Sequence, residues 1–234
     1  MSGWPRTAEE LVAAQQVLAA ARPLPWTPPR RPLKVGACVV AFPRGKTGAG
    51  AAGDPGWAAA AVLRGRDVVA EATVSGEAGA PYAPGLLALR EGPLHEAAVR
   101  ALAFAPDVLL VDATGHDHPR RAGLALHLGA VLDLPTVGVT HRPLLAAGEW
   151  PEDVRGATAD LRLDGERVGA WLRTRRGARP LAVHAGWRTD VETAVAVVLA
   201  AGGRHRTPDP VRHARRLARV TRSRAARTPG TASS

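Results

Sequence analysis

The chain is poor in the residues that stabilise exported or membrane proteins. It has a single cysteine, Cys38, among 234 residues, so it has no intrachain disulfide and we expect a reducing, cytoplasmic location. No uninterrupted apolar run approaches the roughly 18 residues that a membrane-spanning helix needs, so we expect no membrane contact. Residues 11–21 are apolar-rich, but Gln15 and Gln16 interrupt them, which favours an amphipathic helix over a signal peptide.

Lysine is scarce as well, and occurs only at Lys34 and Lys46. The formal net charge is nevertheless +10 and the sequence pI about 11.3, because arginine is abundant. This balance favours a polyanionic partner, DNA or possibly RNA, since arginine binds phosphate through two parallel hydrogen bonds. A chain rich in Ala, Arg, Gly and Pro also arises from a GC-rich genome without functional meaning, so composition leaves both interpretations open.

Local patterns predict one α/β domain with a mixed sheet. Three antiparallel strands precede an alternation of helices and strands, which is typical of such a sheet. The predicted helices cover 8–21, 86–104, 119–132, 189–201 and 208–220, and the predicted strands cover 33–42, 57–64, 67–75, 107–112, 135–140, 159–163, 167–174 and 180–184. We expect an N-terminal helix and Pro-rich linker over 1–32, the domain over 33–220, and a basic disordered tail over 221–234.

Residues 108–121 carry the most specific local pattern. An apolar run ends in Asp112, and a Gly/His turn then leads to Pro119, Arg120 and Arg121. A strand of this kind delivers an acid to the sheet edge where open α/β folds place their chemistry. The proline suits the first turn of a helix, and the arginines lie where phosphate could be held. Alternatively Asp112 only caps the next element, and the arginines pair with acids on the helix face.

Four segments resemble motifs of the endonuclease V family, the deoxyinosine-directed repair nucleases. Residues 81–91, PYAPGLLALRE, resemble PY-x-PG-x-L-x-x-RE, and residues 111–129 resemble VDG-x-G-x-HPRR-x-G-x-A-x-HLG. Residues 134–139 resemble LPTIGV, and residues 186–194 resemble GHRVDLETA, all in register from about 33 to 219. The resemblance implies a ribonuclease H-like fold, with a mixed sheet and flanking helices. It also implies hydrolysis, with Mg²⁺ or Mn²⁺, of a phosphodiester on the 3′ side of the deaminated base.

The resemblance also implies roles for individual residues. Glu91 and Asp112 match two metal-binding acids, and carboxylates are ligands that Mg²⁺ prefers. Asp190 is a further candidate catalytic acid, or else the N-cap of the following helix. Tyr82 matches the wedge that enters the duplex beside the lesion, the alternative being a surface turn residue. The positions expected at DNA are Pro81, Tyr82, Ala83, Pro84, Gly85, Arg90, Gly115, His116, His118, Pro119, Arg120, Arg121, Gly138 and His141.

Three positions depart from the family pattern. The family's first strand reads AGVDVAF, with its Asp as a metal ligand, whereas residues 36–42 read GACVVAF, so that Cys38 or Val39 stands at the Asp position. Trp187 replaces the GHR histidine, and His141 replaces a lysine. Two main predictions follow: a deoxyinosine endonuclease, or an impaired relative that binds deaminated or distorted nucleic acid without cutting it. A generic arginine-rich binder is a third, and in each case we expect a monomer.

Overall fold

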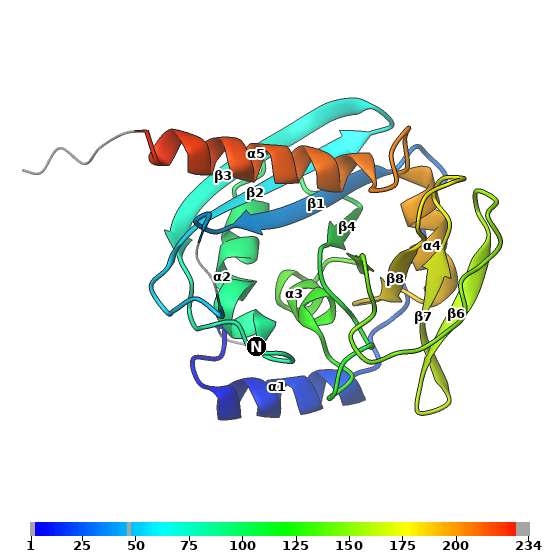
Figure 1. The fold of residues 1–234 in the computed structure, drawn as a ribbon, viewed down its shortest axis with the longest axis horizontal. Helices are drawn as coiled ribbons and strands as arrows, with labels where there is room; N and C mark the ends of the chain where they lie inside the picture. The colour runs from blue at the N-terminus through cyan, green and yellow to red at the C-terminus, as the bar shows by residue number, and fades with distance from the viewer. Residues whose placement is uncertain (1–2, 46–47, 228–234) are drawn as a thin grey trace, which may run out of the picture.

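One eight-stranded mixed sheet with helices on both faces forms the body of the protein (Figure 1). The computed structural model describes residues 3–45 and 48–227. The strand order is β3-β2-β1-β4-β5-β8-β7-β6. The elements are α1 (Ala8–Ala20), β1 (Lys34–Ala41), β2 (Pro55–Arg64), β3 (Asp67–Glu77), α2 (Leu87–Arg100), β4 (Val108–Val111), α3 (Leu124–Leu132), β5 (Thr136–Thr140), β6 (Thr158–Leu163), β7 (Glu166–Leu172), β8 (Leu181–Ala185), α4 (Val191–Ala200) and α5 (Asp209–Ala225).

The centre of the sheet consists of the three parallel strands β1, β4 and β5, and the outer strands pair antiparallel. Val111 at the end of β4 lies between Cys38 of β1 and Gly138 of β5 in the ladder. The carboxyl ends of parallel strands share one edge, so Asp112 emerges there beside the ends of β1 and β5. The predicted mixed-sheet α/β class is confirmed.

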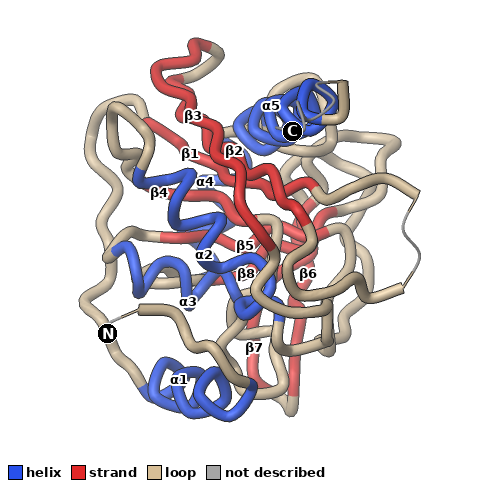
Figure 2. The backbone as a smooth tube through the Cα atoms, turned by 90° about the vertical axis from the view of Figure 1, so that its left-hand side faces the viewer, coloured by secondary structure: helices blue, strands red, loops and turns tan. Residues whose placement is uncertain are grey.

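Helices α2 and α3 cover one face of the sheet, with α1 beyond them, and α4 and α5 cover the other (Figure 2). Side chains alternate between the faces along a strand. Cys38 therefore packs with Leu94 and Ala98 of α2, whereas Val39 packs with residues of α4 and α5. Cys38 is thus the residue that faces helix α2, which also carries Glu91.

Two predicted boundaries are wrong. The helix expected from 119 begins only at Leu124, because Arg121 has a left-handed backbone (φ 55°) that no α-helix accommodates. Residues 221–225, expected to be disordered, continue α5, where Arg222 donates to the Phe42 carbonyl oxygen at 3.0 Å. The rest of the predicted tail, 228–234, lies outside the described residues.

The predicted start of the first helix is confirmed. Thr7 is its N-cap, and its hydroxyl accepts the Glu10 N–H at 3.2 Å. Over the ranges that the structure describes, no helix has both the length and the apolarity to cross a membrane.

Candidate functional site

A pocket of about 210 Å³ opens beside Asp112 at the carboxyl edge of the parallel strands. Its walls come from the segment after β4, the loop before α2, the loop after β5, and Gln15 of α1. The lining residues are Gln15, Tyr82, Ala83, Gly85, Leu87, Ala88, Asp112, Ala113, Thr114, His118, Gly123, Leu124, Thr140, Arg142, Pro143 and Leu144. Of the expected metal ligands, Asp112 lines this pocket and Glu91 does not.

Tyr82 lies at the rim of this pocket with 48% of its surface exposed. Its N–H donates to the Ala49 carbonyl oxygen at 2.7 Å. Three residues later, the Gly85 carbonyl oxygen accepts hydrogen bonds from Gln15 Nε2 at 3.1 Å and Arg120 Nη2 at 2.8 Å. The backbone of the loop is therefore fixed on both sides of the ring, while the ring itself faces outward.

His118 and Arg120, both expected at DNA, support this loop from inside. Arg120 donates through Nε to Gln15 Oε1 at 2.6 Å, and its backbone N–H donates to His118 Nδ1 at 3.1 Å. Burial, aided by the charge of Arg120, lowers the pKa of His118 to about 4, so the imidazole is neutral. Both side chains are used in holding α1 against the Tyr82 loop.

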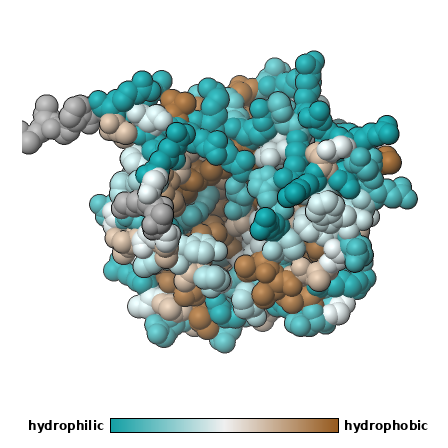
Figure 3. Space-filling view, viewed as in Figure 1, coloured by the Kyte–Doolittle hydropathy of each residue, from teal (hydrophilic) through white to brown (hydrophobic). Residues whose placement is uncertain are grey.

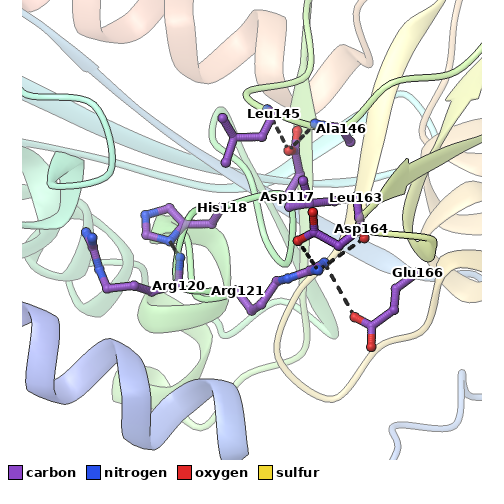
Figure 4. Close-up of polar contacts among 9 residues, drawn as sticks. All are labelled: Asp117, His118, Arg120, Arg121, Leu145, Ala146, Leu163, Asp164 and Glu166. Atoms are coloured by element: carbon purple, nitrogen blue, oxygen red, sulfur yellow. Dashed lines mark hydrogen bonds and ion pairs between the residues drawn. The ribbon is translucent and has the colours of Figure 1, made fainter.

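Arg121 points the other way, toward the turn between β6 and β7 (Figure 4). Its guanidinium lies 3.0 Å from Asp164 and 3.5 Å from Glu166, and donates to the Leu163 carbonyl oxygen at 3.1 Å. The alternative that this arginine pairs with acids is the one observed, although the acids lie on a strand turn and not on the helix face that we expected. Arg121 points in this direction because its backbone is left-handed at the position where we expected the first turn of a helix.

Asp117, which the sequence analysis did not single out, holds the opposite wall of the pocket (Figure 4). Its fully buried carboxylate accepts the backbone N–H groups of Leu144, Leu145 and Ala146 at 2.6, 2.8 and 2.8 Å. His184 Nδ1 lies 4.0 Å from it, and burial lowers the pKa of that imidazole to about 4, leaving it neutral. The carboxylate therefore fixes the loop after β5 through three charge-assisted hydrogen bonds.

The two expected metal acids are each paired with a neighbouring basic side chain. Asp112 Oδ2 lies 2.7 Å from Arg215 Nη2 of α5, and Glu91 Oε2 lies 3.4 Å from His95 Nε2 of α2. The Cys38 thiol also lies beside His95. Burial disfavours the charged imidazole, but Cys38 and Glu91 outweigh that effect and raise the pKa of His95 to about 10. Cys38, one of the two candidates for the strand-one acid position, is thus a thiol next to an imidazole, whereas Val39, the other candidate, follows Cys38 as Asp112 follows Val111 in the β1–β4 register.

These residues do not fit a magnesium centre. Mg²⁺ prefers an octahedral shell of oxygen ligands, whereas a thiol is a soft ligand. The remaining acids, Glu91 and Asp112, lie against positively charged or protonatable groups. Among the residues that the structure describes, no three or more His, Cys, Asp or Glu side chains form a group able to hold a metal ion. The disagreement with the expected cofactor originates on β1, where neither Cys38 nor Val39 offers an oxygen ligand, and at Arg215, which pairs with Asp112.

Three further predicted positions lie in a different hollow, of about 790 Å³, between α1 and the start of α4. Asp190 caps α4 by accepting the Thr193 N–H at 2.7 Å, so the N-cap alternative is the one observed. Trp187 packs against Leu18 of α1, and His116 Nδ1 lies 3.0 Å from the Arg121 carbonyl oxygen. None of these three side chains lines the pocket beside Asp112.

The other residues that we expected at DNA either pack inside the protein or lie at the border of the pocket. A Cβ on Gly115 would lie 1.8 Å from the Ala185 carbonyl oxygen, and one on Gly138 would lie 2.4 Å from that of Ala113, so both glycines allow backbones to approach closely. Arg90 is buried and donates to the Ala80 carbonyl oxygen at 2.7 Å. Pro81, Pro84 and Pro119 do not line the pocket, whereas Ala83 and Gly85 do.

His141 is exposed at the same sheet edge. Partial burial and the positive charge of Arg206 lower its pKa, and the charges of Asp112 and Arg215 also act on it. These four residues therefore surround one region after β4 and β5. Sequence reasoning missed Arg206, His95 and Gln15 as parts of the site, because Arg206 and Gln15 meet their partners across the fold and His95 joins Glu91 of its own helix to Cys38 of β1. The only signal was Gln15, a polar residue in an apolar run.

Comparisons with known proteins agree with this architecture. The family model described as endonuclease V matches residues 34–216. Endonuclease V of Streptomyces avermitilis is 41% identical over 222 residues, covering 93% of each chain, and its crystal structure superposes with a TM-score of 0.85 at 40% identity over 97% of each chain. The catalytic domain of human endonuclease V gives 0.81 at 31% identity, over 96% of this chain and 100% of that one.

A more distant structure contains DNA. Ciona intestinalis endonuclease V, in complex with a 24mer DNA containing an inosine followed by a ribo-adenosine, has a TM-score of 0.76 at 22% identity, over 93% of this chain and 98% of that one. At that identity it supports the fold alone. The fold is ribonuclease H-like, as the motifs implied. With the family match over 34–216 and the Streptomyces relative matched along most of both chains, the protein belongs to the endonuclease V family.

Proposed function

We propose that this protein recognises inosine-containing DNA at the Tyr82 pocket and binds it without Mg²⁺-dependent cutting. One observation carries the proposal: the loop that matches the family's recognition motif is present, whereas the first strand lacks the acid that matches the family's metal ligand. Tyr82 is exposed on a loop whose backbone is hydrogen-bonded at Ala49 and Gly85, next to a pocket of about 210 Å³. An aromatic ring held in this way can stack where a base has been extruded.

The site chemistry favours binding over hydrolysis. Neither Cys38 nor Val39 supplies an oxygen ligand on the first strand, and Arg215 places a positive charge against Asp112. In such nucleases the metal ions activate water and stabilise the leaving oxygen, so weakening their site lowers the rate by orders of magnitude. The Ciona relative, crystallised with inosine-containing DNA, supports inosine as the base to test first.

A second candidate is the family's own reaction, hydrolysis on the 3′ side of deoxyinosine with Mg²⁺ or Mn²⁺. The observation that favours it is that Glu91 and Asp112 both remain, on α2 and after β4, as the family motifs require. Hydrolysis would then depend on these two acids alone.

One labelled duplex separates the two candidates. Anisotropy on a duplex with a single inosine, and on the matched undamaged duplex, measures recognition; a denaturing gel of the same Mg²⁺-containing reactions measures nicking. We expect tighter binding to the inosine duplex and no nick. Equal affinity for both duplexes would contradict recognition, and a Mg²⁺-dependent nick would establish the second candidate.

A further inference from the structure

A shallow groove of about 880 Å³ runs along α5 and is lined mostly by basic residues. They include Arg206, Arg212, Arg215, Arg216, Arg219 and Arg227, and no acidic side chain of the described residues lines the groove. In the space-filling view, hydrophilic side chains gather over α5 along the top of the molecule, above a central hollow (Figure 3). A groove of one charge sign attracts an anion of matching length.

Two of the arginines on α5, Arg216 and Arg219, are available to such an anion. Positions 212, 215, 216 and 219 share one side of the helix through their three- and four-residue spacing. Arg216 and Arg219 are exposed, and within the ranges that the structure describes no carboxylate pairs with either. Like charges at this spacing destabilise a helix, so an anion bound between them would stabilise it. Genome composition explains many arginines, but not their alignment along one acid-free groove.

Arg215 connects this groove to the Tyr82 pocket. Its side chain lines the groove, and its guanidinium lies 2.7 Å from Asp112, which lines the pocket. The two hollows therefore meet at one ion pair. Arg206 of the groove and His141 of the pocket edge lie near the same pair. A strand that enters the pocket can continue along α5 without leaving positively charged surface.

We propose that the groove along α5 holds the phosphates of a DNA strand leading to the Tyr82 pocket, with Arg215 providing at Asp112 the positive charge that a metal ion would otherwise provide. The proposal rests on the function proposed for the pocket. It adds a site for the sugar-phosphate backbone of the DNA, and it predicts that binding at this site does not need a metal ion. Arginine suits this task because its planar guanidinium binds a phosphate through two hydrogen bonds. Affinity for the strand then depends on salt, through counterion release, and not on Mg²⁺.

The probe for the groove is an undamaged single-stranded DNA, so that inosine recognition does not enter the measurement. We expect the double variant Arg216→Gln/Arg219→Gln to bind several-fold more weakly, with a slope of log affinity against log salt that is smaller by about 0.7 for each phosphate that the variant no longer neutralises. Arg6→Gln is the matched control, because Arg6 is exposed beside α1, on the opposite side of the molecule from α5 (Figure 1). Equal affinities for the double variant and the control would overturn the proposal.

Arg215 tests the claim about metal. Wild-type affinity for the same strand should be equal in EDTA and in Mg²⁺ at matched ionic strength. Arg215→Gln should bind more weakly in EDTA and recover part of that affinity in Mg²⁺, because the Asp112 carboxylate becomes free, whereas Arg215→Lys should retain the affinity. Thermal melting of each variant controls for folding. Mg²⁺-enhanced binding by the wild type, or no effect of Arg215→Gln in EDTA, would overturn the role given to Arg215.

Two further results keep the groove separate from the pocket. If Arg216→Gln/Arg219→Gln binds the single strand more weakly but keeps the wild-type ratio of affinities for the inosine and undamaged duplexes, the groove acts independently of the pocket. This result supports the groove even if the wild type itself does not distinguish the two duplexes. Heparin provides the second result. If the wild type binds heparin with the same affinity as DNA, and both affinities fall by the same factor in the double variant, the groove is a general polyanion surface and the proposal of a DNA-binding groove is contradicted.

Discussion

The carboxylate of Asp112 and the guanidinium of Arg215 are 2.7 Å apart, and they join the end of the central strand β4 to the last helix, α5. The guanidinium is a cation that occupies one side of this carboxylate. A second cation at Asp112 must therefore displace Arg215 or share the carboxylate with it. In a family whose motif places a metal-binding acid here, this ion pair changes what the site can bind.

Tyr82→Ala should weaken binding to an inosine duplex by about 1–3 kcal/mol, the usual contribution of one stacked aromatic side chain. It should weaken binding to the undamaged duplex much less, because that binding depends on phosphate contacts. Anisotropy titrations on both duplexes measure the two effects. Tyr82→Phe retains the ring and is the matched control. Equal effects on the two duplexes would identify Tyr82 as a structural turn residue.

Asp117→Ala should lower the free energy of unfolding by about 2–4 kcal/mol, because three buried backbone N–H groups lose a charged acceptor. Urea unfolding measures the change. Glu166→Ala is the comparison, since Glu166 is an exposed acid paired with Arg121, and its removal should cost less than about 1 kcal/mol. Similar effects of the two substitutions would contradict the structural role of Asp117.

Acid should destabilise the fold between pH 6.5 and 4. His118, His127 and His184 each have a pKa lowered by burial from 6.5 to about 4, so in this window the unfolded chain binds protons that the folded chain does not. The free energy of unfolding therefore falls as pH decreases through the window. Urea unfolding at its two ends measures the fall.

His127→Phe should reduce that fall. The ring of His127 stacks on Trp4 with centroids 4.6 Å apart, which Phe can preserve, and burial alone lowers its pKa. Substituting it removes one of these proton-linked groups without removing the stack. An unchanged pH dependence in His127→Phe would show that this histidine does not contribute to it.

Local patterns predicted most of the fold, because β1 is a short apolar run and the β2–β3 hairpin is marked by the turn at its tip. The start of α3 could not be predicted, since the left-handed backbone at Arg121 is stabilised by Asp164 and Glu166, more than 40 residues away. The β1–β4 register likewise distinguishes Cys38 from Val39, because Val39 is the residue beside Asp112. A shift of one residue along a strand exchanges its two faces, and sequence alone left both alignments open.

The site was predictable where a motif named its residues, and less so where partners come from far along the chain. Tyr82 and Asp112, both named by the motifs, line one pocket. His118 and Arg120 carry the expected motif, yet they bind Gln15 and Gly85, so their inward orientation followed only from the packing of α1. The spacing of arginines on α5 was visible in the sequence, but the pairing of Arg215 with Asp112, 103 residues away, was not.

The measurement that tests this account most directly is single-turnover nicking of an inosine duplex in Mg²⁺ by the wild type, Cys38→Asp and Val39→Asp. In the β1–β4 register Val39 follows Cys38 as Asp112 follows Val111, so Val39→Asp places its carboxylate beside Asp112, whereas Cys38→Asp places one toward α2 on the opposite face of the sheet. We predict no nick by the wild type or by Cys38→Asp, and a Mg²⁺-dependent nick by Val39→Asp. Efficient nicking by the wild type would contradict the account.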